Sequence, residues 1–320
     1  MRALPRLRLA TLPTPLRRAE RLERVLGARS LWIKRDDLAG FALAGNKARK
    51  LEFIVADALE RGCDTLLTGG GPGSNHCHAT AAAAKVAGLA CRLVLYGSEP
   101  SPPPAALRLA RSFGAEACFT GDPDRASVDR VLEEEAGLLA TQGGRPYVVP
   151  RGGATALGAV GYALAAEELA GQLAGEGVEP QMVVVAAGSC GTQAGLVTGA
   201  VGGGYPWRVV GASVSRPPDE CRERVLLLGR QCAGLVGVPP PGDEHVEVLD
   251  ARGPGYGVRS PEGAEAAELA AGTEGLLLDP VFTAKAMGAL IAMVRQGSDG
   301  PIVFVHTGGT AALLEEKGFG

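Results

Sequence analysis

Lys47 stands in a sequence context that suits a nucleophilic amine. It follows Gly45 and Asn46 at the expected start of a helix, and Arg49 and Lys50 come within the same turn. An amine whose pKa is lowered by neighbouring cations or by burial forms Schiff bases with carbonyl compounds. The alternative is a solvated lysine at a helix start, which has no chemical role. The residue types alone leave both interpretations open.

Three glycine-rich segments each join a strand to a helix, at residues 68–76, 187–195 and 306–310. Such a junction points unpaired backbone N–H groups and the positive end of the helix dipole at one place, which suits a phosphate or a carboxylate. None of the three contains G-x-G-x-x-G. The segment before Lys47 only approximates a P-loop, because Asn46 intervenes and Ala48 has no hydroxyl for magnesium. We therefore expect an anion site without ATP hydrolysis.

Composition excludes several classes of protein. The chain has 320 residues, of which 46% are hydrophobic and 21% charged, and this is typical of a globular protein large enough for two lobes. No apolar run approaches the about 18–20 residues that span a bilayer. The seven cysteines form no C-x-x-C pair, so we expect reduced thiols and a cytoplasmic protein.

The basic N-terminal segment and the histidines raise the questions of nucleic-acid binding and of metal binding, and we expect neither. The first 50 residues carry 13 Lys and Arg against 4 Asp and Glu, but no aromatic interleaving accompanies them, so we expect no nucleic acid. His76 and His78 point about 200° apart on a helix and cannot share an ion, so we expect no metal site. Asp36 and Asp37 are expected to form ion pairs with Arg35 and Arg49 rather than a catalytic pair.

The elements that must position these residues alternate along the chain. Strands are expected at 31–34, 64–68, 91–95, 117–120, 182–187, 209–214 and 302–306. Helices are expected at 46–61, 75–87, 102–113, 127–141, 156–170, 192–201, 261–271 and 283–296, and the Pro- and Gly-rich segment 143–153 is expected to be a loop. This alternation predicts an α/β protein with parallel sheets and a ligand beyond the carboxyl ends of the strands.

Seven segments together resemble one known family. They are residues 34–38, 45–52, 74–76, 188–196, 256–257, 278–287 and 306–309. In this order, within about residues 12–314, they resemble the D-cysteine desulfhydrase and 1-aminocyclopropane-1-carboxylate (ACC) deaminase family. The resemblance implies a fold-type-II pyridoxal 5′-phosphate enzyme, similar to tryptophan synthase β, of amino-acid metabolism.

The family's architecture implies two α/β domains, each with a mainly parallel sheet flanked by helices, and the cofactor in the cleft between them. Residues 1–48 and 154–320 would form the large cofactor-binding domain, and residues 49–153 the small one. The resemblance also implies a small-molecule amino-acid substrate and a homodimer.

The resemblance implies roles for individual residues around the cofactor. Lys47 would form the Schiff base with it, Asn75 would hydrogen-bond its ring hydroxyl, and Thr307 would face its pyridine nitrogen. The implied phosphate cradle consists of Gly188, Ser189, Cys190, Gly191 and Thr192.

The substrate side of the implied site has its own residues. Ser74 would stand across the ring from Lys47, and either could act as the base that removes the α-proton. Tyr256 is the third implied catalytic residue. The implied substrate contacts are Ser74, Asn75, His76, Phe282 and Thr283.

The implied activity is α,β-elimination of D-cysteine, or a related amino acid, to pyruvate or another 2-oxo acid, ammonia, and sulfide or a thiol. Thr283 and Thr307 favour this branch over the alternative, an ACC deaminase. Gly73 and Phe282 replace the family's usual Gln and Tyr, and favour a second alternative, a β-eliminase of a modified or S-substituted cysteine. A third alternative is a relative that binds the cofactor without turnover.

Overall fold

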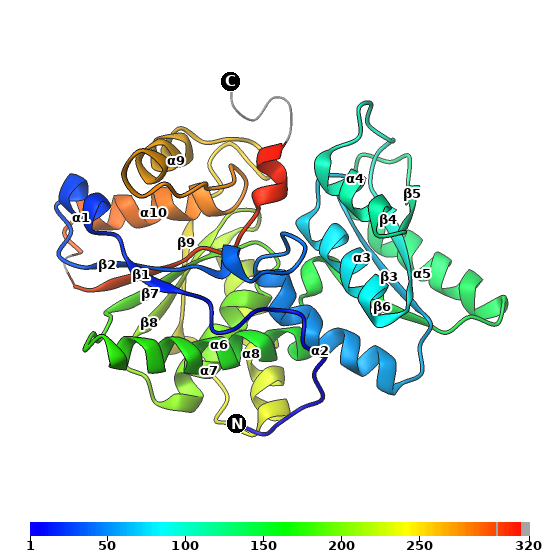
Figure 1. Ribbon diagram of the computed structural model, residues 1–320, viewed down its shortest axis with the longest axis horizontal. Coiled ribbons are helices and arrows are strands. Elements are labelled where there is room, and N and C mark those ends of the chain that lie inside the picture. Colours follow the sequence, from blue (N-terminus) through cyan, green and yellow to red (C-terminus); the bar gives the residue numbers. More distant parts are fainter. Residues whose placement is uncertain (299, 315–320) are drawn as a thin grey trace.

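The computed structural model describes residues 1–298 and 300–314, and its strands form two separate sheets (Figure 1). The six-stranded sheet has the order β1-β2-β10-β7-β8-β9, and its strands are β1 (Leu16–Arg18), β2 (Leu31–Lys34), β10 (Ile302–Val305), β7 (Met182–Ala187), β8 (Arg208–Ser213) and β9 (Val246–Asp250). The four-stranded sheet has the order β5-β4-β3-β6, and its strands are β5 (Glu116–Phe119), β4 (Ala90–Leu95), β3 (Thr65–Gly70) and β6 (Pro146–Val149). All pairs are parallel except β1 with β2.

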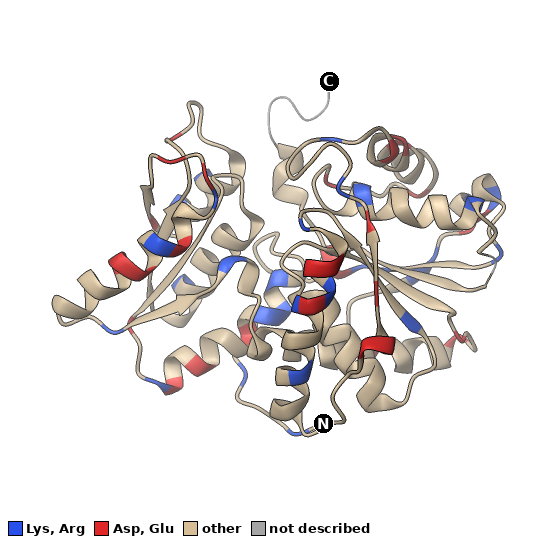
Figure 2. Cartoon of the chain, turned by 180° about the vertical axis from the view of Figure 1, so that it is seen from behind, with Lys and Arg blue, Asp and Glu red and all other residues tan. Residues whose placement is uncertain are grey.

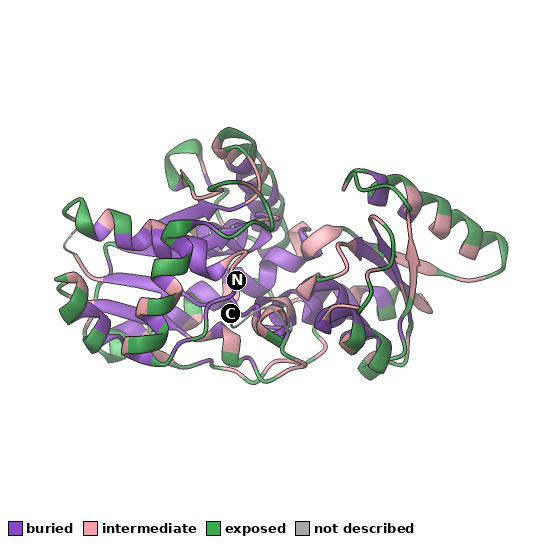
Figure 3. Ribbon diagram, turned by 90° about the horizontal axis from the view of Figure 1, so that it is seen from above, coloured by how far each residue is buried: buried purple, intermediate pink, exposed green. Residues whose placement is uncertain are grey.

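Helices cover both faces of the six-stranded sheet. On one face lie α6 (Ala156–Gly175), α7 (Gly191–Gly203) and α8 (Pro218–Val236), and on the other lie α1 (Glu20–Leu26), α9 (Pro261–Glu274) and α10 (Thr283–Arg295). Side chains of a strand alternate between faces, so Val183 packs in the first layer and Val184 in the second. Figure 3 shows the result, with buried strands between helices that are exposed on their outer sides. A strand buried on both faces needs a continuous apolar run, as β7 has.

The smaller sheet follows the same rule. Helices α2 (Asn46–Glu60), α3 (Asn75–Ala87) and α4 (Ala105–Ser112) pack on one face, and α5 (Ser127–Thr141) packs on the other. Leu66 faces the first group and Leu67 the second. The described residues also form short 3₁₀ helices, which are η1 (Asp36–Leu38), η2 (Arg151–Gly153), η3 (Asp243–His245) and η4 (Thr310–Leu314).

Helix α2 joins the two lobes through buried ion pairs. Arg49 is 2% exposed and binds Asp36 and Glu168 at 2.8–3.0 Å, while Lys34 also binds Glu168. Figure 2 shows that basic and acidic residues lie close together where the two lobes meet. The expected ion pairs of Asp36 with Arg49 and of Asp37 with Arg35 are confirmed. The network fixes the start of α2 against the larger lobe.

The α/β architecture with mainly parallel sheets is confirmed, and one local expectation is wrong. Segment 143–153 is not a loop throughout, because Tyr147, Val148 and Val149 pair with β3 as strand β6. The flanking Gly and Pro residues favoured the prediction of a loop over that of a strand for this short β-branched run. The domain boundaries at 48–49 and 153–154 stay a prediction. Within the described residues, no helix is long and apolar enough to cross a bilayer.

Candidate active site

A cavity of about 400 Å³ lies where strands of both sheets end. Its walls include residues that come one or two positions after parallel strands, among them Gly71 after β3, Arg151 after β6, Gly188 after β7 and Ser215 after β8. Thr307, which comes soon after β10, completes this set. The carboxyl ends of parallel strands leave such a crevice in α/β proteins, as the sequence predicted.

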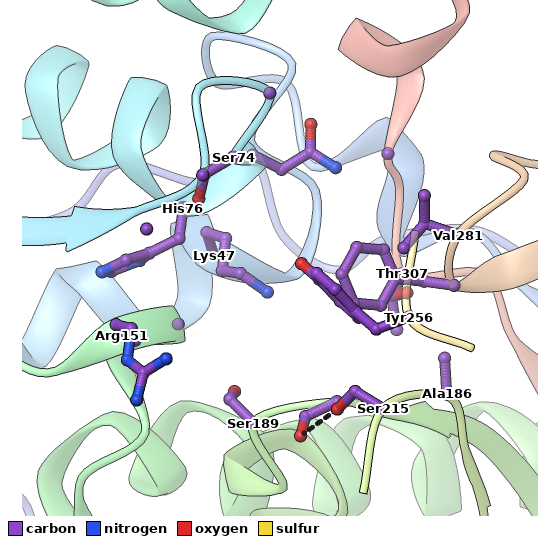
Figure 4. Close-up of a pocket in the computed structure, with 18 of the residues that line it drawn as sticks. Lys47, Ser74, His76, Arg151, Ala186, Ser189, Ser215, Tyr256, Val281 and Thr307 are labelled. Atoms are coloured by element: carbon purple, nitrogen blue, oxygen red, sulfur yellow. Dashed lines mark hydrogen bonds between the residues drawn. The ribbon is translucent and has the colours of Figure 1, made fainter. Parts of the chain in front are cut away.

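Lys47 projects into this cavity from the first turn of α2 (Figure 4). Its amine donates a hydrogen bond of 3.0 Å to Asn46 Oδ1. Burial lowers the pKa of Lys47 to about 8, with a smaller opposing effect from the Asp279 carboxylate. Near physiological pH a minor fraction of this amine is therefore neutral, far more than for an ordinary lysine, which favours its action as a nucleophile or a base.

The backbone before Lys47 packs directly on the segment after β10. Gly45 has φ of 53°, and a Cβ there would lie 2.3 Å from the Thr307 carbonyl oxygen. The Asn46 N–H donates to that oxygen at 2.9 Å. Only glycine permits this approach, so it places Lys47 and Thr307 in one wall of the cavity.

The start of α7 forms an anion-binding cradle. Ser189, Cys190 and Thr192 line the cavity, and α7 begins at Gly191, between Cys190 and Thr192. The first N–H groups of a helix have no partner within it and, together with the helix dipole, attract an anion. Lys50 adds a buried amine, since a Cβ on Gly191 would lie 3.2 Å from Lys50 Nζ.

The start of α3 faces the cradle across the cavity. Ser74 caps α3 by accepting a 3.3 Å hydrogen bond from the Cys77 N–H. Asn75 Oδ1 is buried and has no hydrogen-bond partner among the described residues. His76 Nε2 lies 2.9 Å from Thr68 Oγ1, and burial, with the amines of Lys47 and Lys50, holds the pKa of His76 well below its ordinary value. The imidazole is therefore neutral.

Tyr256 and Phe282 form an aromatic part of the cavity wall, and their ring centroids lie 6.1 Å apart. Tyr256 points into the cavity toward Lys47 (Figure 4). Thr283 does not line the cavity. It is fully buried, and its hydroxyl lies 2.8 Å from Asp279 Oδ1, so the residue reaches the site only through the Asp279 carboxylate.

The sequence analysis missed several polar side chains in the wall. They are Tyr96, Arg125, Asp129, Arg151, Arg216, Arg224 and Asp279. Arg151 forms a bidentate ion pair with Asp129, and Arg224 Nε donates to the Ser189 carbonyl oxygen at 3.3 Å. Two of them could have been found from their position in the sequence. Arg151 and Arg216 each come within three residues of the end of a parallel strand, where ligands bind in α/β proteins.

Comparison with known proteins identifies the cofactor of this chain. Residues 7–308 match the family described as pyridoxal-phosphate dependent enzymes. The chain belongs to this family. A D-cysteine desulfhydrase of Salmonella choleraesuis (strain SC-B67) is 44% identical to this pyridoxal-phosphate enzyme over 97% of the chain and 95% of the relative.

Two solved structures resemble the whole chain. A structure of an ACC deaminase homologue matches with a TM-score of 0.90 and 37% identity, over 97% of this chain and 93% of its own. A pyridoxal 5′-phosphate-dependent aspartate racemase matches with a TM-score of 0.69 and 18% identity, over 92% of this chain and 90% of its own, and shares the fold. The chain is thus a fold-type-II pyridoxal-phosphate enzyme and a lyase of the D-cysteine desulfhydrase and ACC deaminase family.

The residues present fit pyridoxal phosphate. The unpartnered Asn75 Oδ1 suits the hydroxyl on the cofactor ring, because a buried acceptor needs a donor. The start of α7 suits the phosphate, and the neutral fraction of Lys47 suits the aldehyde carbon.

Proposed function

We propose that this enzyme eliminates sulfide from D-cysteine, giving pyruvate and ammonia. The observation that carries the proposal is the position of Lys47, whose pKa of about 8 suits proton abstraction, in one cavity with Ser74, Tyr256 and the α7 cradle. The relatives named D-cysteine desulfhydrase support the choice of substrate. Overall, D-cysteine and water give hydrogen sulfide, pyruvate and ammonium.

Lys47 is the proposed base. When bound, pyridoxal phosphate withdraws electrons from the bonds of the amino-acid α-carbon. Lys47 Nζ, in its neutral form, would take the proton from the substrate Cα. Ser74 Oγ, at the start of α3, is the alternative base, and the N–H groups of residues 74–76 receive the substrate carboxylate.

Thr307 is proposed to face the pyridine nitrogen with a neutral hydroxyl. The nearby carboxylate of Asp279 is occupied, because it accepts hydrogen bonds from the N–H groups of Val281 and Phe282 and from Thr283. It therefore acts as the cap of α10. A neutral partner leaves the ring nitrogen unprotonated, which suits an elimination in which the leaving group carries the electrons away.

Tyr256 is the proposed partner of the leaving sulfur. Desolvation of the hydroxyl in the cavity wall raises the pKa of the Tyr256 phenol, so the hydroxyl stays protonated and can donate. Phe282, beside it, offers no such proton.

A second candidate substrate is an S-substituted cysteine. Gly73 lines the cavity, and a Cβ there would meet nothing within 4 Å, so this wall has free space. Phe282 adds an apolar ring on the opposite wall. A larger thiol could leave from such a pocket.

The assembly and the compartment are also proposals. Exposed Leu38, Leu43 and Leu277 supply apolar surface for a homodimer, which sedimentation would reveal. The seven cysteines are all free thiols, which supports a reducing cytoplasmic environment.

The proposed function is tested by giving the purified holoenzyme D-cysteine, L-cysteine, S-methyl-D-cysteine and ACC in parallel. Sulfide and pyruvate in equal amounts from D-cysteine would support the proposal. Methanethiol formation faster than sulfide formation would favour the S-substituted class, and 2-oxobutanoate from ACC would favour the deaminase. No product from any of them would contradict the proposal and favour a relative without turnover.

A further inference from the structure

Two buried thiols lie in contact behind the phosphate cradle. Cys190 Sγ and Cys221 Sγ are 3.3 Å apart, and the residues are 2% and 0% exposed. Cys190 precedes the first residue of α7, and Cys221 lies in the first turn of α8. The pair therefore connects the segment that receives the phosphate with a helix that supports it from outside.

The surroundings of Cys190 favour a reactive thiolate. A hydrogen bond from the Cys221 thiol lowers the pKa of Cys190, and the cations Arg216, Arg224 and Lys50 lower it further, although burial opposes them. Cys190 is also one of the residues that line the cavity, although its side chain is buried. A low thiol pKa and access are the two conditions for oxidation at a particular cysteine.

Other buried cysteines of the chain lack these features. Burial raises the pKa of Cys77 to about 11 and that of Cys91 to about 12. No cation lowers either pKa, and among the described residues neither thiol contacts another at hydrogen-bond distance. They are matched internal controls, because they share burial with Cys190 and Cys221 but not the thiol contact or the positive charge.

We propose that Cys190 and Cys221 form an oxidation site, at which a peroxide converts the two thiols into a reversible disulfide that loosens the phosphate cradle. The Cys190 thiolate attacks one peroxide oxygen, the O–O bond breaks, and hydroxide leaves. Cys221 then attacks the Cys190 sulfur, the S–S bond forms, and the S–O bond breaks to release water. In total, two thiols and one hydrogen peroxide give one disulfide and two waters, with the sulfurs oxidised and the peroxide oxygens reduced.

The disulfide would change the cradle because its geometry is narrow. The two sulfurs must approach from 3.3 Å to about 2.0 Å. Cys190 holds a left-handed backbone conformation with φ of 72°, which is strained for a residue other than glycine. Pulling its side chain toward α8 turns the neighbouring N–H groups away from the phosphate. Oxidation is therefore expected to weaken retention of the cofactor, and a dithiol such as dithiothreitol to restore it.

The test is graded oxidation of the holoenzyme by hydrogen peroxide. After catalase removes the peroxide, free thiols are alkylated in denaturant and peptides are analysed by mass spectrometry. The expected first product is a cross-link between the peptides containing Cys190 and Cys221, with two hydrogens lost, while Cys77 and Cys91 stay alkylatable. Cofactor absorbance after desalting falls in parallel, and dithiothreitol followed by pyridoxal phosphate restores it.

The Cys221→Ser variant provides the matched control. It is expected to keep its cofactor before oxidation, to form no cross-link, and to give a dimedone adduct at Cys190 after peroxide. Recovery of both thiols in alkylated form, or oxidation of Cys77 and Cys91 at the same rate, would overturn the proposal. A cross-link that leaves cofactor retention unchanged would overturn its link to the cradle.

Discussion

The guanidinium carbon of Arg125 lies 4.1 Å from the centroid of the Tyr256 ring. Arg125 belongs to the loop before α5 in the smaller lobe, and Tyr256 to the segment between β9 and α9 in the larger lobe. The cation on the ring face therefore ties the two lobes together at the wall of the cavity. Phe282 meets the same ring edge-on, so Tyr256 is held from two directions.

Removing the Tyr256 hydroxyl is expected to slow the chemical step. Tyr256→Phe keeps the ring and its contacts with Arg125 and Phe282 but deletes the proposed proton donor. We expect kcat for D-cysteine to fall by about 10²–10⁴-fold, the usual effect of losing one proton-transfer group. Steady-state pyruvate formation measures this, and an unchanged kcat would remove Tyr256 from the catalytic group.

Replacing Arg125 shows whether its contact with Tyr256 between the lobes affects substrate binding or the chemical step. Arg125→Met deletes the cation and keeps most of the side-chain length. A cation–π contact contributes about 0.5–2 kcal/mol, so we expect KM to rise up to about 30-fold with a smaller change in kcat. A larger fall in kcat than Tyr256→Phe produces would show that Arg125 acts on the reaction itself.

Gly188 and Phe282 are expected to depend on each other. A Cβ on Gly188 would lie 2.9 Å from Phe282 Cε1, closer than van der Waals contact allows. Gly188→Ala should therefore displace either the ring or the phosphate cradle and weaken cofactor binding. Adding Phe282→Leu creates room and should restore most of the affinity, measured by fluorescence titration with pyridoxal phosphate. Equal weakening in the single and double variants would contradict this steric explanation.

The buried ion pairs of α2 are expected to dominate the charge contribution to stability. Asp36→Asn leaves the buried Arg49 with Glu168 as its remaining anionic partner, and breaking one such buried pair destabilises by about 3–5 kcal/mol. The exposed pair of Arg130 and Glu134 is the control, since Arg130→Met should change the free energy of unfolding by less than about 1 kcal/mol. Urea unfolding measures the free energy of unfolding of both variants. Similar losses in Asp36→Asn and Arg130→Met would contradict a dominant role for the buried ion pairs.

Lys47 is expected to lower the stability of the cofactor-free protein below about pH 8. Its pKa is about 8 in the fold and 10.5 ordinarily, so the unfolded chain binds more protons between these values. Lys47→Met removes this penalty. The variant should therefore be more stable than the wild type below pH 8, with the difference declining to zero as the pH rises to 10.5. Urea midpoints across this range test it, and a constant difference would contradict it.

The candidate site was predictable where local sequence signals and fold geometry coincide. The glycine-rich junctions after β3, β7 and β10 were visible as composition, and all three meet at one cavity because they follow parallel strands. The alternation of short apolar runs with amphipathic stretches along the chain likewise predicted β7 and α2 within one residue of their observed bounds.

Features that depend on contacts between distant segments were missed. Arg125 contacts Tyr256 across 131 positions of the chain, which no local pattern encodes. Thr283 looked like a substrate contact from its motif, but its hydroxyl turns inward to Asp279 because that carboxylate caps α10. The 3.3 Å approach of Cys190 and Cys221 also depends on how α8 packs, and the sequence analysis did not predict that helix.

The most direct test of the account is to find which amine carries the cofactor. Lys47 and Lys50 both lie near the cradle, and both have lowered pKa values. Reduction of the holoenzyme with borohydride fixes the cofactor on its lysine, and peptide mass spectrometry then identifies the residue. We expect a phosphopyridoxyl group on Lys47 alone, and its loss in Lys47→Ala together with all pyruvate formation from D-cysteine. A label on Lys50, or an active Lys47→Ala enzyme, would show that Lys47 does not carry the cofactor.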